Sequence, residues 1–272
     1  MRLLKKIFKL VLLKIEKKTF DLININTFFF NILKTVFSYK LQNISKEDRL
    51  FFLSDKNHNS LYISRYKRIG IYKFGVKERL VNLQKSYKTQ SIELSKNDCV
   101  VDIGANIGEF GKFWAEKGHK IYAYEPDVIE FSALKLNLPN SFLFNLGLWN
   151  KPDVLKFYHK NNSGDSSFFE TKNFEKVTEV KVKTLDSFNI ADPIGLIKIE
   201  SEGAEPEIIE GGKETIKRSK YVAIDAGEER GLKSESTLLP VINKLLDLGF
   251  EFIDFESTSL RILMKNKLEK SI

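Results

Sequence analysis

Two carboxylates and two glycines lie close together in the sequence, in a pattern suited to holding a nucleoside. Asp102 ends an apolar run in VVDIGANIGEFG, and Gly104 and Gly108 follow it directly. Glycine adopts backbone angles closed to other residues and lets a ligand approach the chain. Glu125 ends the next apolar run, where an acid can accept hydrogen bonds from ribose hydroxyls. The residues predicted to bind this ligand are Asp102, Gly104, Ala105, Asn106, Gly108 and Glu125.

The spacing of the glycines indicates which nucleoside cofactor fits. A dinucleotide fingerprint requires G-x-G-x-x-G to seat a pyrophosphate, whereas GANIG lacks the middle glycine. The carboxylate of Asp102 would repel a pyrophosphate but suits an ammonium group or a bridging water. S-adenosylmethionine carries no phosphate and ends in an amino acid, so it is the cofactor we expect. Glu125 supports a ribose without distinguishing between cofactors.

A second group of ionisable residues occurs in the stretch KIESEGAEP. Glu200 and Glu202 should end a buried strand, share one side of it, and have Lys198 on the same face. A Lys–Glu ion pair could then hold one carboxylate, while burial raises the pKa of a glutamate enough for it to act as a base for a hydroxyl. The alternative is that one acid caps the following helix and the other binds the cofactor or the lysine.

Two further options concern the same chemistry. His159, which precedes the polar loop KNNSGDSS, is an alternative base because histidine titrates near neutral pH. Glu200, Glu202 and Asp225 could supply oxygen ligands to Mg²⁺, although no metal site is predicted.

The elements that position these residues form a regular alternation from residue 97 onward. Short apolar runs rich in β-branched and aromatic residues predict strands at 99–103, 120–124, 141–145, 195–200, 221–225, 251–255 and 260–264. Helices are expected at 108–117, 128–137, 206–217 and 237–248, and extra strands at 154–158 and 179–183. The fold class is therefore α/β, a doubly wound and mostly parallel sheet that binds ligands at the carboxyl ends of its strands.

Two details refine this fold. Only ESTS separates the last two strands, which should therefore form an antiparallel C-terminal hairpin. That hairpin is typical of the class I methyltransferase (Rossmann-like) fold and is absent from an ordinary dinucleotide-binding domain. Asn145 and Gly147 follow the third strand, where the adenine of the cofactor is expected.

Charge and composition limit the function classes. The formal net charge is +8, but most of the excess lies in residues 1–40, so the rest of the chain is nearly neutral and lacks the basic footprint of a nucleic-acid-binding protein. The single cysteine, Cys99, allows no intramolecular disulfide, which fits a reducing cytoplasm. One cysteine and three histidines offer no zinc cluster.

The chain divides into a basic amphipathic segment at 1–40, an accessory helical or cap region at 41–95 with a helix near 77–87, the cofactor-binding domain at 96–265, and a tail at 266–272. The N-terminal segment contains no convincing signal peptide and no apolar run of about 20 residues that could span a membrane. Residues 1–20 could form a helix that lies on the inner face of an anionic membrane, or one that packs on the protein itself or on a second subunit.

The sequence resembles the FkbM family of S-adenosylmethionine-dependent methyltransferases. The matching stretches are VVDIGANIGEF, AYEPD, TLDSF, LIKIESEGAEPEIIEGG and YVAIDAGEERG, within residues 70–265. The family commonly has Asp in place of Glu200 and often Glu in place of Asp225. The resemblance implies O-methylation of a hydroxyl on a sugar or other secondary metabolite, with a small-molecule or lipid-linked glycan of surface polysaccharide synthesis as substrate.

Other functions remain open at this point. A non-catalytic binding or scaffold protein could retain the same fold, and a methyltransferase could act on a small molecule that is not a sugar. Amino-methylation of nucleic acid would need a [DN]PP[YF] loop where this chain has ESEGAEP. A nicotinamide-dependent sugar enzyme is disfavoured by the missing middle glycine.

Overall fold

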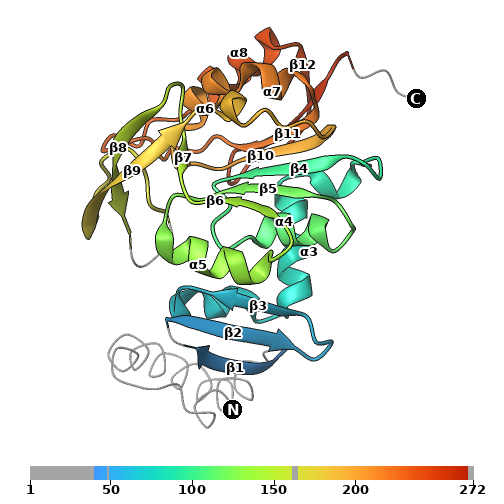
Figure 1. Ribbon diagram of the computed structural model, residues 1–272, viewed down its shortest axis with the longest axis vertical. Helices are drawn as coiled ribbons and strands as arrows, with labels where there is room; N and C mark the ends of the chain where they lie inside the picture. The colour runs from blue at the N-terminus through green and yellow to red at the C-terminus, as the bar shows by residue number, and fades with distance from the viewer. Residues whose placement is uncertain (1–39, 48, 161–164, 269–272) are drawn as a thin grey trace.

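The computed structural model describes residues 40–47, 49–160 and 165–268. Within them, the central element is a seven-stranded sheet in the order β12-β13-β11-β10-β4-β5-β6 (Figure 1). Its strands are β4 Cys99–Ile103, β5 Ile121–Tyr124, β6 Phe142–Phe144, β10 Ile194–Ile199, β11 Ser219–Asp225, β12 Phe250–Glu256 and β13 Arg261–Asn266.

The directions of these strands confirm the predicted fold. β11, β10, β4, β5 and β6 pair in parallel, and β13 pairs antiparallel with both β11 and β12. β4 and β10 are buried along their whole length, because helices cover both faces of the sheet. The terminal hairpin on a parallel sheet is that of the class I methyltransferase fold. The predicted boundary at residue 266 falls inside β13.

Helices cover the sheet on two sides (Figure 1). One side carries α6 Glu205–Gly211, α7 Lys213–Lys217 and α8 Leu238–Asp247, and the other carries α3 Val76–Ser86, α4 Glu109–Ala115 and α5 Val128–Asn137. The helix expected at 206–217 is divided in two. Gly212 has φ −123° and ψ 16°, outside the helical region, and a glycine at this point makes the break inexpensive.

The accessory region at 41–95 differs from the expected helical cap. It begins with an antiparallel sheet of β1 Leu41–Glu47, β2 Leu50–Asp55 and β3 Ser60–Ile63, followed by the 3₁₀ helix η1 Tyr66–Tyr72, then α3 and the short η2 Thr89–Ser91. The reason is the period-2 pattern of SLYI, which buries alternate side chains and suits a strand rather than a helix.

The accessory sheet packs against α5. The side-chain amide of Asn137 accepts a hydrogen bond from the backbone nitrogen of Tyr62 and donates one to its carbonyl, at 2.8 Å each. The same amide donates to the carbonyl of Ile107, in the glycine-containing loop, at 2.7 Å. A single buried side chain therefore joins the accessory region, α5 and that loop.

A third sheet follows β6, as the extra predicted strands indicated. It consists of β7 Gly147–Leu148, β9 Lys176–Lys183 and β8 Asp153–His159, in that order, and the 3₁₀ helix η3 Leu185–Phe188 comes after it. Because the chain passes from β6 of the central sheet almost directly into β7, this small sheet lies beside the carboxyl ends of β5 and β6 (Figure 1).

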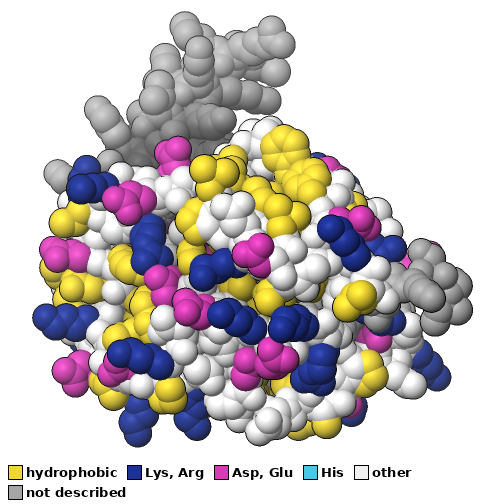
Figure 2. All heavy atoms as spheres, turned by 90° about the horizontal axis from the view of Figure 1, so that it is seen from above, with side chains coloured by type: hydrophobic (Ala, Val, Ile, Leu, Met, Phe, Trp, Pro, Cys, Tyr) yellow, Lys and Arg dark blue, Asp and Glu magenta, His cyan; other side chains and the backbone are white. Residues whose placement is uncertain are grey.

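The N-terminal segment and the surface charge are the features that concern binding to a membrane or to another protein. The expected amphipathic segment at 1–39 lies outside the described residues. Of the helices in the described part of the chain, none combines the length and the apolar character needed to cross a membrane. On the face around α8, acidic and basic side chains are interspersed with hydrophobic ones, and neither sign of charge dominates (Figure 2).

Candidate active site

The loop after β4 is folded tightly against the end of β10. Gly104 has φ +67°, and a Cβ atom on it would lie 1.7 Å from the carbonyl oxygen of Glu200. The backbone nitrogens of Gly104 and Ala105 both donate to the carbonyl of Tyr124 at 3.0 Å. Asn106 also has a positive φ, of 52°. The loop thus bridges the carboxyl ends of three adjacent strands and forms one wall of a pocket with Gly104, Ala105 and Asn106.

Two residues predicted to contact the ligand lie behind this loop instead. Asp102 is completely buried, accepts a hydrogen bond from the nitrogen of Gly111 at 3.0 Å, and lies 3.2 Å from the ammonium of Lys198. Burial raises the pKa of Asp102, and Lys198 opposes that rise. Gly108 begins α4 at φ +88°, and a Cβ there would lie 2.7 Å from the side chain of Leu134. Neither residue lines the pocket; both support the loop.

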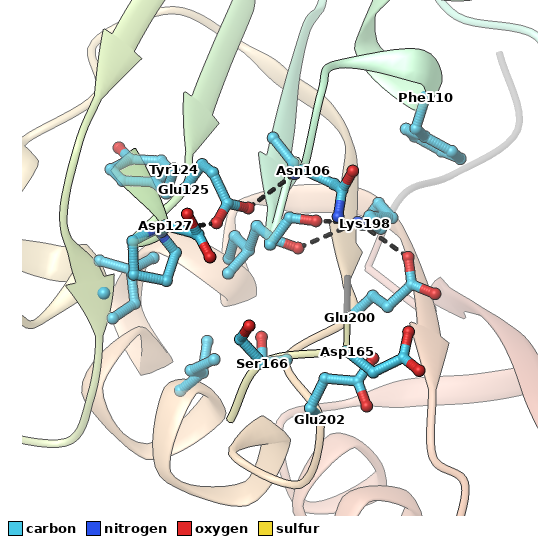
Figure 3. A pocket seen from close by; sticks show the side chains of 18 of the residues that line it. Asn106, Phe110, Tyr124, Glu125, Asp127, Asp165, Ser166, Lys198, Glu200 and Glu202 are labelled. Atoms are coloured by element: carbon cyan, nitrogen blue, oxygen red, sulfur yellow. Dashed lines mark hydrogen bonds and ion pairs between the residues drawn. The ribbon is translucent and has the colours of Figure 1, made fainter. Parts of the chain in front are cut away.

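The end of β5 carries a carboxylate on the pocket wall. Glu125 accepts hydrogen bonds from the nitrogens of Asn106 at 2.7 Å and Asp127 at 2.8 Å (Figure 3). Burial raises its pKa to about 8. Asn145 donates to the carbonyl of Glu125 at 2.8 Å and does not line the pocket, whereas Gly147 does. Asn145 therefore fixes the strand end from which Glu125 projects.

A cluster of charges marks the end of β10. The predicted Lys198–Glu200 ion pair is confirmed at 3.3 Å, and Arg261 of β13 pairs with Glu200 at 2.9 Å. Lys198 also donates to the carbonyl of Gly104 at 2.7 Å. Burial alone would raise the pKa of Glu200, but Lys198 and Arg261 together lower it to about 2. This shift is opposite to the expected one and makes Glu200 a weak base.

Glu202 lies in a different environment from Glu200. It sits past the end of β10 with φ +51°, so the two acids do not share a strand face as expected. Both nevertheless line the pocket, together with Asp165 (Figure 3). Burial and the negative charges of Glu229 and Asp165 raise the pKa of Glu202 well above its ordinary value. Of the two predicted acids, only Glu202 has the raised pKa that was expected of a base.

His159 is held away from the pocket. Its Nδ1 lies 3.1 Å from a carboxylate oxygen of Asp127 and its Nε2 lies 2.7 Å from the hydroxyl of Thr178. Both ring nitrogens are engaged, and the pocket wall nearby is formed by Phe157 and Asp127. The structure therefore gives no support to His159 as the base.

The accessory region contributes two arginines that the sequence did not single out. Arg68 of η1 and Arg79 of α3 line the pocket and both bind Glu109, at 3.2 and 2.7 Å. Arg68 also donates to the side chain of Asn106 at 2.8 Å. The basic stretch RYKRIG was the available signal, but nothing in it indicated which arginine would reach the glycine loop.

Two of the three acids considered as ligands for Mg²⁺, Glu200 and Asp225, are arranged as ion-pair partners. Arg261 binds Asp225 at 2.7 Å and Glu200 at 2.9 Å, so both carboxylates face the same guanidinium. In the part of the chain that the structure describes, no group of three or more His, Cys, Asp or Glu side chains has the geometry of a metal site.

One protein family is identified by comparison with known proteins. The model of the methyltransferase FkbM domain matches residues 102–252. The chain is 22% identical over 209 residues to the 2-O-methyltransferase NoeI of Sinorhizobium fredii, across 68% of this chain and 86% of that protein. A crystal structure of methyltransferase FkbM from Methylobacillus flagellatus has a sequence 20% identical to this chain. The match covers 69% of this chain and 50% of that one, with a TM-score of 0.47. The chain thus spans about half of that structure. A TehB-like methyltransferase from Corynebacterium glutamicum is 14% identical, with a TM-score of 0.40 across 71% and 88% of the two chains.

Proposed function

The chain belongs to the FkbM methyltransferase family, and from this premise we propose that it transfers a methyl group from S-adenosylmethionine to a hydroxyl of a sugar or glycan. That it is a methyltransferase follows from the family. The observation that carries the finer proposal is the pocket at the ends of β4, β5 and β10, which is lined by the glycine loop, by Glu125 at the end of β5 and by Glu202 past the end of β10.

The pocket fits the cofactor in its donors and acceptors. Glu125 is a buried acceptor whose carboxylate receives two backbone N–H groups and can take further donors, as the hydroxyls of a ribose provide. Apolar side chains of Leu146, Leu148 and Phe157 line the neighbouring wall, where an adenine ring would find contact. We assign Gly104, Ala105, Asn106 and Gly147 to the same ligand because they form the wall between these groups.

The chemistry asks little of the protein beyond alignment and removal of a proton. S-adenosylmethionine supplies an already activated methyl group, and correct orientation of the hydroxyl can contribute about 7–11 kcal/mol. Glu202 removes the proton of the acceptor hydroxyl, since its raised pKa makes the ionised carboxylate a stronger base than an ordinary glutamate. Glu200, paired with two cations, stays ionised and holds its place without accepting a proton.

Methylation of a hydroxyl is supported by one relative, and a sugar as its carrier by the polar lining of the pocket. The relative NoeI is named as a 2-O-methyltransferase, which is O-methylation by its printed name. The pocket side next to Glu202 also presents Asp165 and Ser166, short polar groups that suit the hydroxyls of a carbohydrate (Figure 3). A non-sugar hydroxyl and a non-catalytic binding role are the alternatives.

The test has two steps. Calorimetry with S-adenosylhomocysteine comes first; tight binding is expected, and its absence would exclude the cofactor and the enzyme together. Transfer of radiolabelled methyl from S-adenosylmethionine is then measured with a panel of free sugars, nucleotide sugars and oligosaccharides, and with phenolic and carboxylate acceptors as controls. Label in the phenols or carboxylates alone would overturn the sugar assignment while leaving the methyltransferase in place.

A further inference from the structure

The glycine loop lies between two clusters of opposite net charge. On one side, Arg68 and Arg79 share the single carboxylate of Glu109. On the other side, the ion-pair cluster at the end of β10 comprises Lys198, Arg261, Asp102, Glu200 and Asp225. The first cluster carries one net positive charge and the second one net negative charge when all groups are ionised.

Both clusters contribute side chains to the pocket lining. Arg68, Arg79 and Glu200 all line the pocket, and Lys198 and Glu200 lie across it from Glu125 and Asp127 in Figure 3. If Glu125 marks the ribose, the rest of an elongated nucleoside extends from it across the glycine loop toward these clusters. A group that carries a positive and a negative charge on one carbon would meet a complementary charge on each side.

Arg79 has the donor that such a group requires. Its Nε and Nη2 bind the two carboxylate oxygens of Glu109, at 2.7 and 3.2 Å. Its third nitrogen, Nη1, makes no hydrogen bond to any residue within 40–47, 49–160 and 165–268. Burial would lower the pKa of Arg79, but Glu109 and Glu200 hold it above its ordinary value, so the guanidinium stays charged. Glu109 fixes the plane of this guanidinium and leaves one edge of it available to a ligand.

We infer that Arg79, supported by Arg68, binds the α-carboxylate of the methionine end of S-adenosylmethionine, and that the acidic side around Glu200 receives its α-ammonium. The inference rests on the proposed function, because it needs that cofactor in the pocket. It gives the accessory region a role in recognising the cofactor, through residues that precede the glycine loop in the sequence. The competing use of these arginines is to bind an anionic group of the acceptor.

The experiment compares two ligands that differ by one carboxylate. Binding of S-adenosylmethionine and of decarboxylated S-adenosylmethionine is measured by calorimetry without acceptor, on the wild type, Arg79→Gln and Arg79→Lys. Arg49→Gln is the matched control, since Arg49 is exposed in the turn between β1 and β2. Wild type should prefer the complete cofactor by roughly tenfold or more, as expected for a charge-assisted hydrogen bond at a partly exposed site.

Arg79→Gln should remove most of that preference by weakening the complete cofactor alone, Arg79→Lys should retain part of it, and Arg49→Gln should retain all of it. Unchanged affinity for the decarboxylated ligand also establishes that the variant is folded. Equal affinity of the wild type for both ligands, or equal weakening of both by Arg79→Gln, would overturn the inference and leave the proposed function standing. Failure of the wild type to bind either ligand would overturn both.

Discussion

Replacement of Gly104 by alanine tests how closely the glycine loop is packed on the end of β10. The residue has φ +67°, a conformation that costs a non-glycine residue roughly 1–2 kcal/mol. The new Cβ would also lie 1.7 Å from the carbonyl oxygen of Glu200, which is backbone and cannot rotate away. Moving residue 104 away from Glu200 would strain the hydrogen bond that the backbone nitrogen of Glu200 donates to the carbonyl of Ile103, at 3.1 Å. Overpacking of this kind costs about 1–3 kcal/mol more.

Gly118→Ala is the matched control, because Gly118 has φ +91° and nothing within 4 Å of its ideal Cβ position. Urea unfolding of the two variants should show a loss of about 1–2 kcal/mol for Gly118→Ala and about 2–5 kcal/mol for Gly104→Ala, with unchanged slopes. Gly104→Ala should also bind S-adenosylhomocysteine more weakly, since the loop must shift into the pocket or away from it. If both variants lost the same stability, the packing argument would be refuted.

Two further predictions concern the titration of pocket acids. Glu202→Gln should lower kcat by about 10²–10⁴-fold with little change in affinity for S-adenosylhomocysteine, while the exposed Glu228→Gln leaves kcat unchanged. In a pH–rate profile of the wild type, kcat should rise as pH increases through the raised pKa of Glu202; the same rise in Glu202→Gln would exclude it as the base. Glu125 has a pKa of about 8 in the folded protein against 4.5 ordinarily, so the folded state binds more protons between these values and loses stability as pH rises. That loss should be absent from Glu125→Gln in urea unfolding at a series of pH values, and an identical pH dependence would falsify the assignment.

The inner strands of the central sheet were predictable because they are mostly apolar runs. Buried parallel strands need no polar alternation, so β4 and β10 are evident in the sequence as CVVDI and IGLIKI. The hairpin followed from the short ESTS connection. The accessory sheet was not predicted, since β1 reads LQNISKE, in which polar residues outnumber apolar ones.

The position of the candidate site could be predicted from the sequence, but the pKa shifts of its acidic side chains could not. The ends of the predicted strands and the spacing of the glycines were enough to predict the locations of Gly104, Glu125 and Glu200. The pKa of Glu200 is lowered by Lys198 and by Arg261 together, and Arg261 lies 61 residues away along the chain, so no local pattern reports its contribution. Arg79 reaches the pocket only because α3 packs on α4, so its role also depends on tertiary structure.

The position of β13 has a consequence for synthesis of the protein. β13 lies between β11 and β12, so a strand made after both of them must enter the interior of the sheet. Until Arg261 has left the ribosome, β11 presents an open edge to other chains, and Glu200 and Asp225 lack a shared counter-ion. A nascent chain therefore cannot hold a complete pocket, and termination before residue 261 should yield a species prone to aggregation and degradation rather than a partly active enzyme.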